Sequence, residues 1–88
     1  QAARLLTYQT VWHTEQGNLD PKLGSAAKLF CSEAYMRGAM QGMQIMGGYG
    51  YMMEFDMQRH FRDAKLMEIG GGTSEIHRSV IGARLVAD

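Results

Sequence analysis

The chain has 88 residues, enough for one small domain, and 45% of them are hydrophobic. Nine basic and nine acidic residues cancel, with no run of either sign, so the sequence lacks the charge pattern of a protein that binds nucleic acid or an anionic membrane. No apolar stretch approaches the 18 residues of a membrane span. We therefore expect no nucleic-acid partner and no membrane association. A helical pattern begins at once after Gln1, so we expect a piece of a longer chain.

Two helices are expected in the first half of the chain. The first covers residues 1 to about 16, where apolar side chains recur at helical spacing. The second begins after Asp20, a favourable N-cap, with Pro21 at the first helical position, and it continues to about Met46. A helix of this length is typical of an antiparallel bundle.

Glycines divide the second half. Gly47 or Gly48 is expected to supply a left-handed C-cap, and a shorter helix should follow from Glu54 to about Lys65 with Asp56 as its N-cap. A last helix should run from Thr73 to about Ala87. No segment alternates apolar and polar residues, so the expected fold class is all-α, an antiparallel helical bundle.

The loop before the last helix is the first candidate site. It reads Ile69-Gly70-Gly71-Gly72-Thr73-Ser74-Glu75-Ile76. Three successive glycines suit a backbone that needs positive φ or a close approach by another molecule, and a helix start offers free N–H groups to an anion or a polar oxygen. The loop is therefore either a ligand-binding loop or a plain linker between helices.

Other motifs give weaker signals. Four methionines share one helical face, a pattern typical of an adaptable core or a subunit contact: Met36, Met40, Met43 and Met46. The three histidines lack partners at metal-ligand spacing, so no metal site is expected. The lone Cys31 excludes an internal disulfide and is expected to pack in the core.

Three motifs taken together resemble the C-terminal end of an acyl-CoA dehydrogenase. They are Gln44-Ile-Met-Gly-Gly-Tyr-Gly-Tyr51, Arg62-Asp-Ala-Lys65 and Gly72-Thr-Ser-Glu-Ile76, in this order and spacing. The resemblance covers all 88 residues and implies part of the C-terminal helical bundle of a flavoenzyme, with the four-helix bundle incomplete. It also implies FAD as cofactor and a homotetramer in the parent enzyme.

The resemblance assigns cofactor contacts to two segments. Gln44, Ile45, Met46, Gly47 and Gly48 match the segment that touches the FAD of a neighbouring subunit. Thr73, Ser74 and Glu75 match the positions that contact the flavin from the last helix. Glycines and a glutamine amide suit these roles, because a glycine pair lets the backbone approach phosphate and the amide both donates and accepts hydrogen bonds.

The implied reaction is the oxidation of an acyl-CoA thioester to the trans-2-enoyl-CoA. In the family a carboxylate removes the α-proton, the β-hydride passes to the flavin, and the electrons go on to electron-transferring flavoprotein. The implied compartment is the cytoplasm of a bacterium or the mitochondrial matrix of a eukaryote.

This sequence departs from the family at the catalytic base. Many members carry Tyr-Glu-Gly-Thr in the loop, but here the tyrosine and glutamate positions are Gly70 and Gly71, so no catalytic residue is assigned within the chain. In the isovaleryl-CoA and long-chain branches the base is a glutamate on an earlier helix, and the Ile-Gly-Gly-Gly-Thr loop resembles theirs. The base is then expected upstream of Gln1. The alternative is a relative with altered chemistry.

Gly71 and Gly72 are the expected substrate-binding residues. The family uses the N–H at the position of Gly71 to hold the thioester carbonyl, and a glycine keeps this donor. The loss of bulky side chains at Gly70 and Gly71 should also leave room for a branched or longer acyl group. Two other functions remain open: a helical oligomerisation module without activity, and a relative acting on a substrate that is not a CoA thioester.

Overall fold

The computed structural model describes residues 1–87 and contains five helices. They are α1 (Ala2–Glu15), α2 (Pro21–Met46), α3 (Gly48–Tyr51), α4 (Met57–Ile69) and α5 (Ser74–Ala87). The described residues contain no strand, so the all-α prediction is confirmed. No helix within residues 1–87 is long and apolar enough to span a bilayer.

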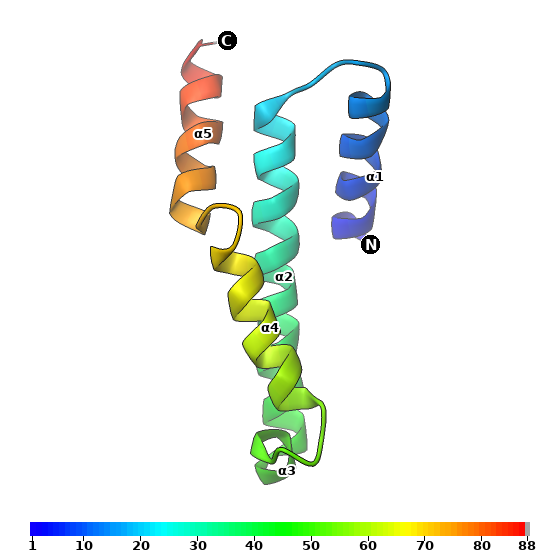
Figure 1. The fold of residues 1–88 in the computed structure, drawn as a ribbon, viewed down its shortest axis with the longest axis vertical. Coiled ribbons are helices and arrows are strands. Elements are labelled where there is room, and N and C mark those ends of the chain that lie inside the picture. The colour runs from blue at the N-terminus through cyan, green and yellow to red at the C-terminus, as the bar shows by residue number, and fades with distance from the viewer. Residues whose placement is uncertain (88) are drawn as a thin grey trace.

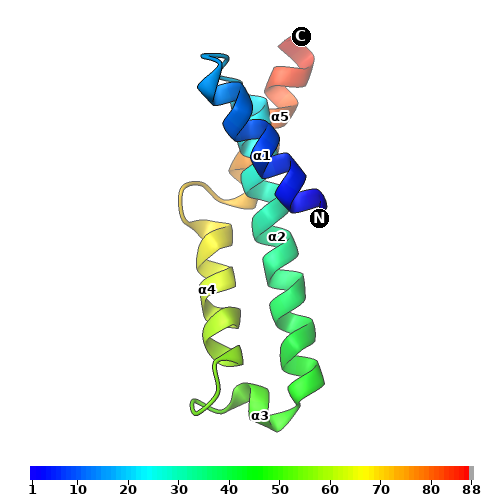
Figure 2. The same cartoon turned by 90° about the vertical axis from the view of Figure 1, so that its right-hand side faces the viewer.

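Helix α2 is the axis of the molecule, and every other helix packs against it. Figure 1 shows α1 and α5 on opposite sides of its N-terminal half and α4 along its C-terminal half. Helices α1, α4 and α5 each run opposite to α2 (Figure 1), which is the expected antiparallel order. The result is an elongated body of 48 × 23 × 18 Å, in which α1 crosses α2 obliquely (Figure 2).

Local chemistry explains where α2 begins and ends. The Asp20 carboxylate accepts a hydrogen bond of 3.0 Å from the Lys22 backbone N–H, and Pro21 occupies the first helical position, as predicted. At the other end, Gly47 has φ 62° and ψ −136°. Its φ is positive as expected, but its ψ lies outside the left-handed helical region that a C-cap of the predicted kind requires. The chain therefore turns into the short α3 instead of leaving helical structure.

Asp56 occupies the N-cap position of α4, as predicted, but its side chain makes no cap hydrogen bond and lies 3.6 Å from the Arg59 guanidinium instead. The helix also continues to Ile69, beyond the predicted end near Lys65. Leu66 is 59% exposed, because only α2 covers the length of α4 and Ala64 occupies the face that packs against it.

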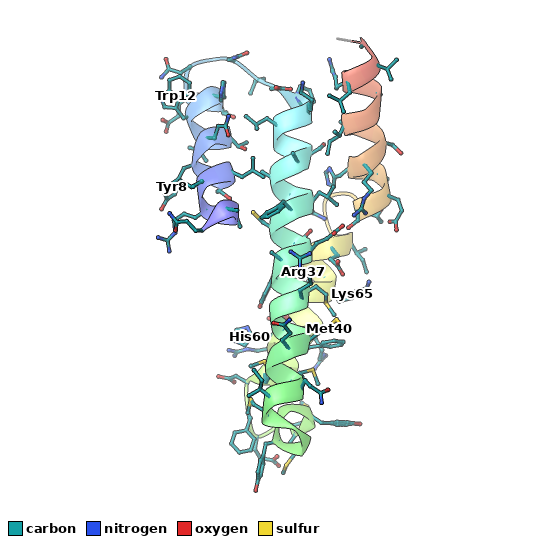
Figure 3. The ribbon with its side chains drawn as sticks, turned by 180° about the vertical axis from the view of Figure 1, so that it is seen from behind. Tyr8, Trp12, Arg37, Met40, His60 and Lys65 are labelled. Atoms are coloured by element: carbon teal, nitrogen blue, oxygen red, sulfur yellow. The ribbon has the colours of Figure 1, made fainter. Side chains whose placement is uncertain are left out.

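The core consists of small side chains. Ala39 and Ala64 are its buried apolar residues, and Ser25 and Ser32 are buried beside them. The Ser32 hydroxyl is satisfied by the Lys28 carbonyl on the same helix, 2.7 Å away, so burying it leaves no unpaired polar group. Small residues permit close approach of the helices, while large apolar side chains such as Tyr8 and Trp12 project from α1 away from α2 (Figure 3).

We expect Gly50→Ala to lower the stability of the full-length protein. A Cβ at Gly50 would lie 3.0 Å from the Met43 carbonyl oxygen and 3.1 Å from the Met43 Cα, so α3 would have to move off α2 at a cost of about 1–3 kcal/mol. The matched control is Gly38→Ala on α2, where a Cβ meets nothing within 4 Å and helix propensity improves by roughly 0.5–1 kcal/mol. Thermal denaturation of both variants tests this, and equal melting temperatures would contradict it.

Candidate functional site

The glycine loop between α4 and α5 adopts a backbone that its sequence predicts. Gly71 has φ 74° and Gly72 has φ 118°, both in regions that side chains disfavour, whereas Gly70 has φ −66° and ψ 137°, which any residue can adopt. The Gly70 N–H closes the end of α4 by donating to the Leu66 carbonyl at 2.7 Å. Among the described residues, the N–H groups of Gly71 and Gly72 find no acceptor. The loop thus presents two free donors.

The loop is fixed by side chains from elsewhere in the fold. The Lys28 ammonium of α2 donates to the Gly72 carbonyl at 2.7 Å. The His77 ring of α5 lies against Gly72, since a Cβ there would be 2.9 Å from His77 Nε2. Nδ1 of the same ring is 3.0 Å from the buried Ser25 hydroxyl. Sequence reasoning missed Lys28 and Ser25 because they lie far from the loop in sequence, and it considered His77 only as a metal ligand.

Thr73 begins α5 in the way the sequence predicts. Its hydroxyl accepts a hydrogen bond of 3.3 Å from the Ile76 N–H, and its carbonyl accepts the first helical bond, from the His77 N–H at 3.0 Å. Ser74 and Glu75 follow in the first turn, where a carboxylate is favoured by the helix dipole.

A polar cleft of about 220 Å³ lies beside this helix start. Two ion pairs occupy its walls: Lys65 to Glu68 at 3.4 Å and Arg78 to Glu33 at 2.6 Å. Thr73, Ser74 and Glu75 complete the lining. The three expected flavin-contact residues therefore share one hydrophilic surface. Two of the three lining carboxylates are paired with Lys65 and Arg78, Glu75 adds one further negative charge, and the hydroxyls remain available to a polar ligand.

An apolar cavity of about 390 Å³ reaches the other side of the loop. Its lining residues come from α2, α4 and the loop: Lys28, Cys31, Ser32, Tyr35, Met67 and Gly70. Cys31 is half-buried there with its sulfur 3.4 Å from the Thr7 hydroxyl, so it packs between α1 and α2. Tyr35 is held by His60 Nδ1 at 2.9 Å. The absence of a side chain at Gly70 leaves this space open.

The second predicted segment, residues 44–48, lies at the far end of α2. Ile45 is 85% exposed, and a Cβ at Gly47 or Gly48 would meet nothing within 4 Å. Gln44 and Gly47 border a separate cavity of about 320 Å³, together with Met40, Met43 and Phe61. Helix α4 separates this end from the glycine loop (Figure 1), a distance of about 20 Å for 13 residues. The structure therefore brings residues 71–75 together and keeps residues 44–48 apart from them.

Proton-transfer and metal chemistry find little support in the described residues. Glu68 is paired with Lys65, and Glu75 belongs to the first turn of α5. Residues 1–87 contain no group of three His, Cys, Asp or Glu side chains placed to hold a metal ion. What the loop offers is hydrogen-bond donation from the backbone of Gly71 and Gly72, between a residue that borders the apolar cavity and one that borders the polar cleft.

Comparison with known proteins identifies relatives over the whole chain. The family model described as "Acyl-CoA dehydrogenase, C-terminal domain" matches residues 1–86. The probable acyl-CoA dehydrogenase YngJ of Bacillus subtilis is 46% identical over 84 residues, 96% of this chain and 22% of the relative. The mitochondrial isovaleryl-CoA dehydrogenase of rice, Oryza sativa, is 41% identical over 85 residues, 97% of this chain and 21% of the relative.

A solved structure confirms the arrangement of the helices. Butyryl-CoA dehydrogenase from Megasphaera elsdenii superposes with a TM-score of 0.93 at 38% identity, covering 97% of this chain and 22% of the other. The chain thus spans about a fifth of the length of the proteins it matches.

Gly72→Ala should disturb the loop through two separable effects. A φ of 118° costs an alanine about 1–3 kcal/mol, and its Cβ would also press on the His77 ring. Adding His77→Ala should relieve the second effect but not the first, so the double variant should melt above Gly72→Ala once the separate cost of His77→Ala is subtracted. Gly71→Ala is the control, because its φ of 74° is strained while its Cβ meets nothing. If the changes in melting temperature of Gly72→Ala and His77→Ala simply add in the double variant, the contact between residue 72 and the His77 ring is contradicted.

Proposed function

The chain belongs to the acyl-CoA dehydrogenase family, and from this premise we propose that residues 1–88 are part of the C-terminal helical domain of an FAD-dependent enzyme that oxidises an acyl-CoA thioester to the trans-2-enoyl-CoA. The observation that carries the proposal is the pair of free N–H donors at Gly71 and Gly72, which lie in the chain between Gly70, a lining residue of the apolar cavity, and Thr73, a lining residue of the polar cleft. An acyl thioester has matching parts: an apolar acyl chain that suits the apolar cavity, and a carbonyl oxygen that accepts hydrogen bonds from N–H donors.

Gly71 acts as a donor to the thioester carbonyl in this proposal. Removal of the α-proton develops negative charge on the carbonyl oxygen, and a fixed N–H that points at this oxygen stabilises the charge. The positive φ at Gly71 and Gly72 turns the backbone so that both N–H groups stay out of helical hydrogen bonding. A glycine cannot abstract the proton, so the base is a glutamate upstream of Gln1, on an earlier helix of the bundle.

FAD is the proposed cofactor, and the chain has two surfaces that fit it. The hydroxyls of Thr73 and Ser74 and the carboxylate of Glu75 line the polar cleft beside the loop. Residues 44–48 offer an exposed, open glycine backbone with a glutamine amide at its edge, which suits close approach to a phosphate. When bound, FAD accepts the β-hydride of the acyl group.

Sharing of FAD between copies explains why the two surfaces are separate. They lie about 20 Å apart along α4 and both are open in a single chain. We assign Thr73, Ser74 and Glu75 to the FAD of their own subunit and residues 44–48 to that of a neighbour in a homotetramer. Exposed apolar side chains near this second surface, such as Ile45 and Tyr49, agree with a protein contact.

The electron acceptor and the compartment follow the family. Electron-transferring flavoprotein receives the electrons, and the enzyme works in the cytoplasm of a bacterium or in the mitochondrial matrix of a eukaryote. Two alternatives are a helical oligomerisation module without activity, favoured by exposed side chains such as Trp12 and Tyr8, and a relative acting on a substrate that is not a CoA thioester.

Anaerobic titration of the full-length protein with a panel of acyl-CoAs tests the function. We expect the protein to purify with FAD, the flavin absorbance to bleach on addition of a suitable acyl-CoA, and an enoyl-CoA to form in equal amount. A flavin-containing protein that no acyl-CoA bleaches would favour the substrate alternative. A stable oligomer that binds no FAD would favour the oligomerisation module.

Gly70→Tyr should narrow the range of acyl groups. The φ and ψ of Gly70 suit any residue, although an added Cβ would lie 3.2 Å from the Leu66 carbonyl oxygen, a contact that the alanine control shares. We expect the tyrosine ring to occupy the apolar cavity that Gly70 borders. We expect kcat/KM for isovaleryl-CoA to fall about 10–200-fold relative to butyryl-CoA, the range for a misfit in an apolar pocket. Gly70→Ala adds little volume and is the control. An unchanged ratio of kcat/KM for the two substrates would place the acyl chain elsewhere.

A further inference from the structure

Lys28 makes an unusual contact for a lysine on a helix. Its ammonium reaches across from the second turn of α2 to the Gly72 carbonyl, 44 residues away in sequence, at 2.7 Å. Within residues 1–87 the ammonium donates this one hydrogen bond, and the Lys28 side chain is partly buried. Holding a lysine side chain in one conformation costs up to about 2 kcal/mol of rotamer entropy. The hydrogen bond to Gly72 must offset this loss.

Ser25 lies one turn before Lys28 on α2 and contacts the same loop indirectly, through His77. It is 8% exposed, and its hydroxyl is 3.0 Å from Nδ1 of His77, whose ring packs against Gly72. One turn of α2 therefore contacts the loop twice, directly through Lys28 and indirectly through the His77 ring. Lys28 thus holds the carbonyl of Gly72, and the His77 ring packs against the Cα of the same residue.

We infer that Lys28 is a positioning residue for the oxidation of the thioester. Its ammonium holds the Gly72 carbonyl, the next carbonyl but one along the chain from the Gly71 N–H, and so restrains the loop in the conformation in which this N–H points at the substrate carbonyl. The inference rests on the proposed function of Gly71. Lys28 lines the apolar cavity but touches neither of the reacting atoms in this account, and its ammonium acts through the loop.

A contact from outside the loop is needed because glycine residues do not restrict their own backbone conformation. Gly71 and Gly72 both have positive φ and no side chain that packs, so contacts from outside the loop must select one conformation from the many that glycine allows. An error of about 1 Å in the position of a catalytic group can cost on the order of 100-fold in rate. A hydrogen bond from a charged donor is stronger than one from a neutral donor, which suits this restraint.

The experiment compares Lys28→Met with Lys28→Arg in the full-length, FAD-loaded protein. Methionine keeps the length and apolar stem but donates no hydrogen bond, whereas arginine keeps a charged donor. Arg37→Met is the matched control, since it removes an exposed cation from the same helix, further along α2 than Lys28 and outside the lining of both cavities beside the loop (Figure 3). The probe is 2,2-dimethylbutyryl-CoA, which has no α-proton and cannot react, and the readout is the infrared stretching frequency of its thioester carbonyl.

In the unsubstituted protein and in Arg37→Met, the carbonyl frequency should fall on binding because the Gly71 N–H polarises the bond. In Lys28→Met it should return towards the value in solution, while kcat for a reactive acyl-CoA falls about tenfold and KM changes less than about threefold. Lys28→Arg should restore most of both signals. A merely structural role would lower the melting temperature without moving the carbonyl frequency of the folded protein.

Two negative results are distinct. If the unsubstituted protein polarises the carbonyl and Lys28→Met does so equally with unchanged kcat, the role of Lys28 is wrong and the proposed function stands. If the unsubstituted protein leaves the carbonyl frequency unchanged, the role of Gly71 is wrong and that of Lys28 falls with it. Should Lys28→Met not fold, Lys28→Gln, whose amide is too short to reach the Gly72 carbonyl, provides the same comparison.

Discussion

The packing of every other helix against α2 is the constraint on which this structure depends. A helix of 26 residues is long enough to support α1 and α5 on one half and α4 on the other, and its start is fixed by Asp20 and Pro21. Both candidate ligand surfaces are attached to it. Ser25 and Lys28 hold the glycine loop near one half, and residues 44–48 form its opposite end. A bend or slip in α2 would move the two surfaces relative to each other.

This arrangement explains why the core is so small. Ala39 and Ala64 let α2 and α4 approach closely, but helices arranged along one axis cannot enclose large side chains as a closed bundle does. Large apolar side chains therefore remain at the surface, among them Trp12, Tyr49 and Ile45. Exposed apolar surface of this extent marks contact with other protein. The chain spans about a fifth of its relatives, so in those proteins further chain is present that can cover the corresponding surface.

Sequence reasoning succeeded where one residue determines the local backbone. Pro21 after Asp20 marked the start of α2, Thr73 marked the start of α5, and the glycines at 71 and 72 marked positive φ. It failed where tertiary contacts decide. The extension of α4 to Ile69 and the contact of Lys28 with Gly72 depend on helices packing side by side, and neither leaves a periodic signal in the sequence. The roles of residues 44–48 and 71–75 remain predictions from the family resemblance.

The triple glycine changes what holds the proposed substrate in place. In a Tyr-Glu-Gly-Thr loop, side chains can pack and orient the backbone that carries the donor N–H. Here Gly70 and Gly71 provide no such packing, and Gly70 instead opens an apolar cavity. The conformation of the loop must then be specified from outside, by the ammonium on its carbonyl and the imidazole ring under its last glycine. Under the proposed function the proton acceptor and the donor loop are separate elements, each of which must be fixed independently, and α2 supplies the support for the loop.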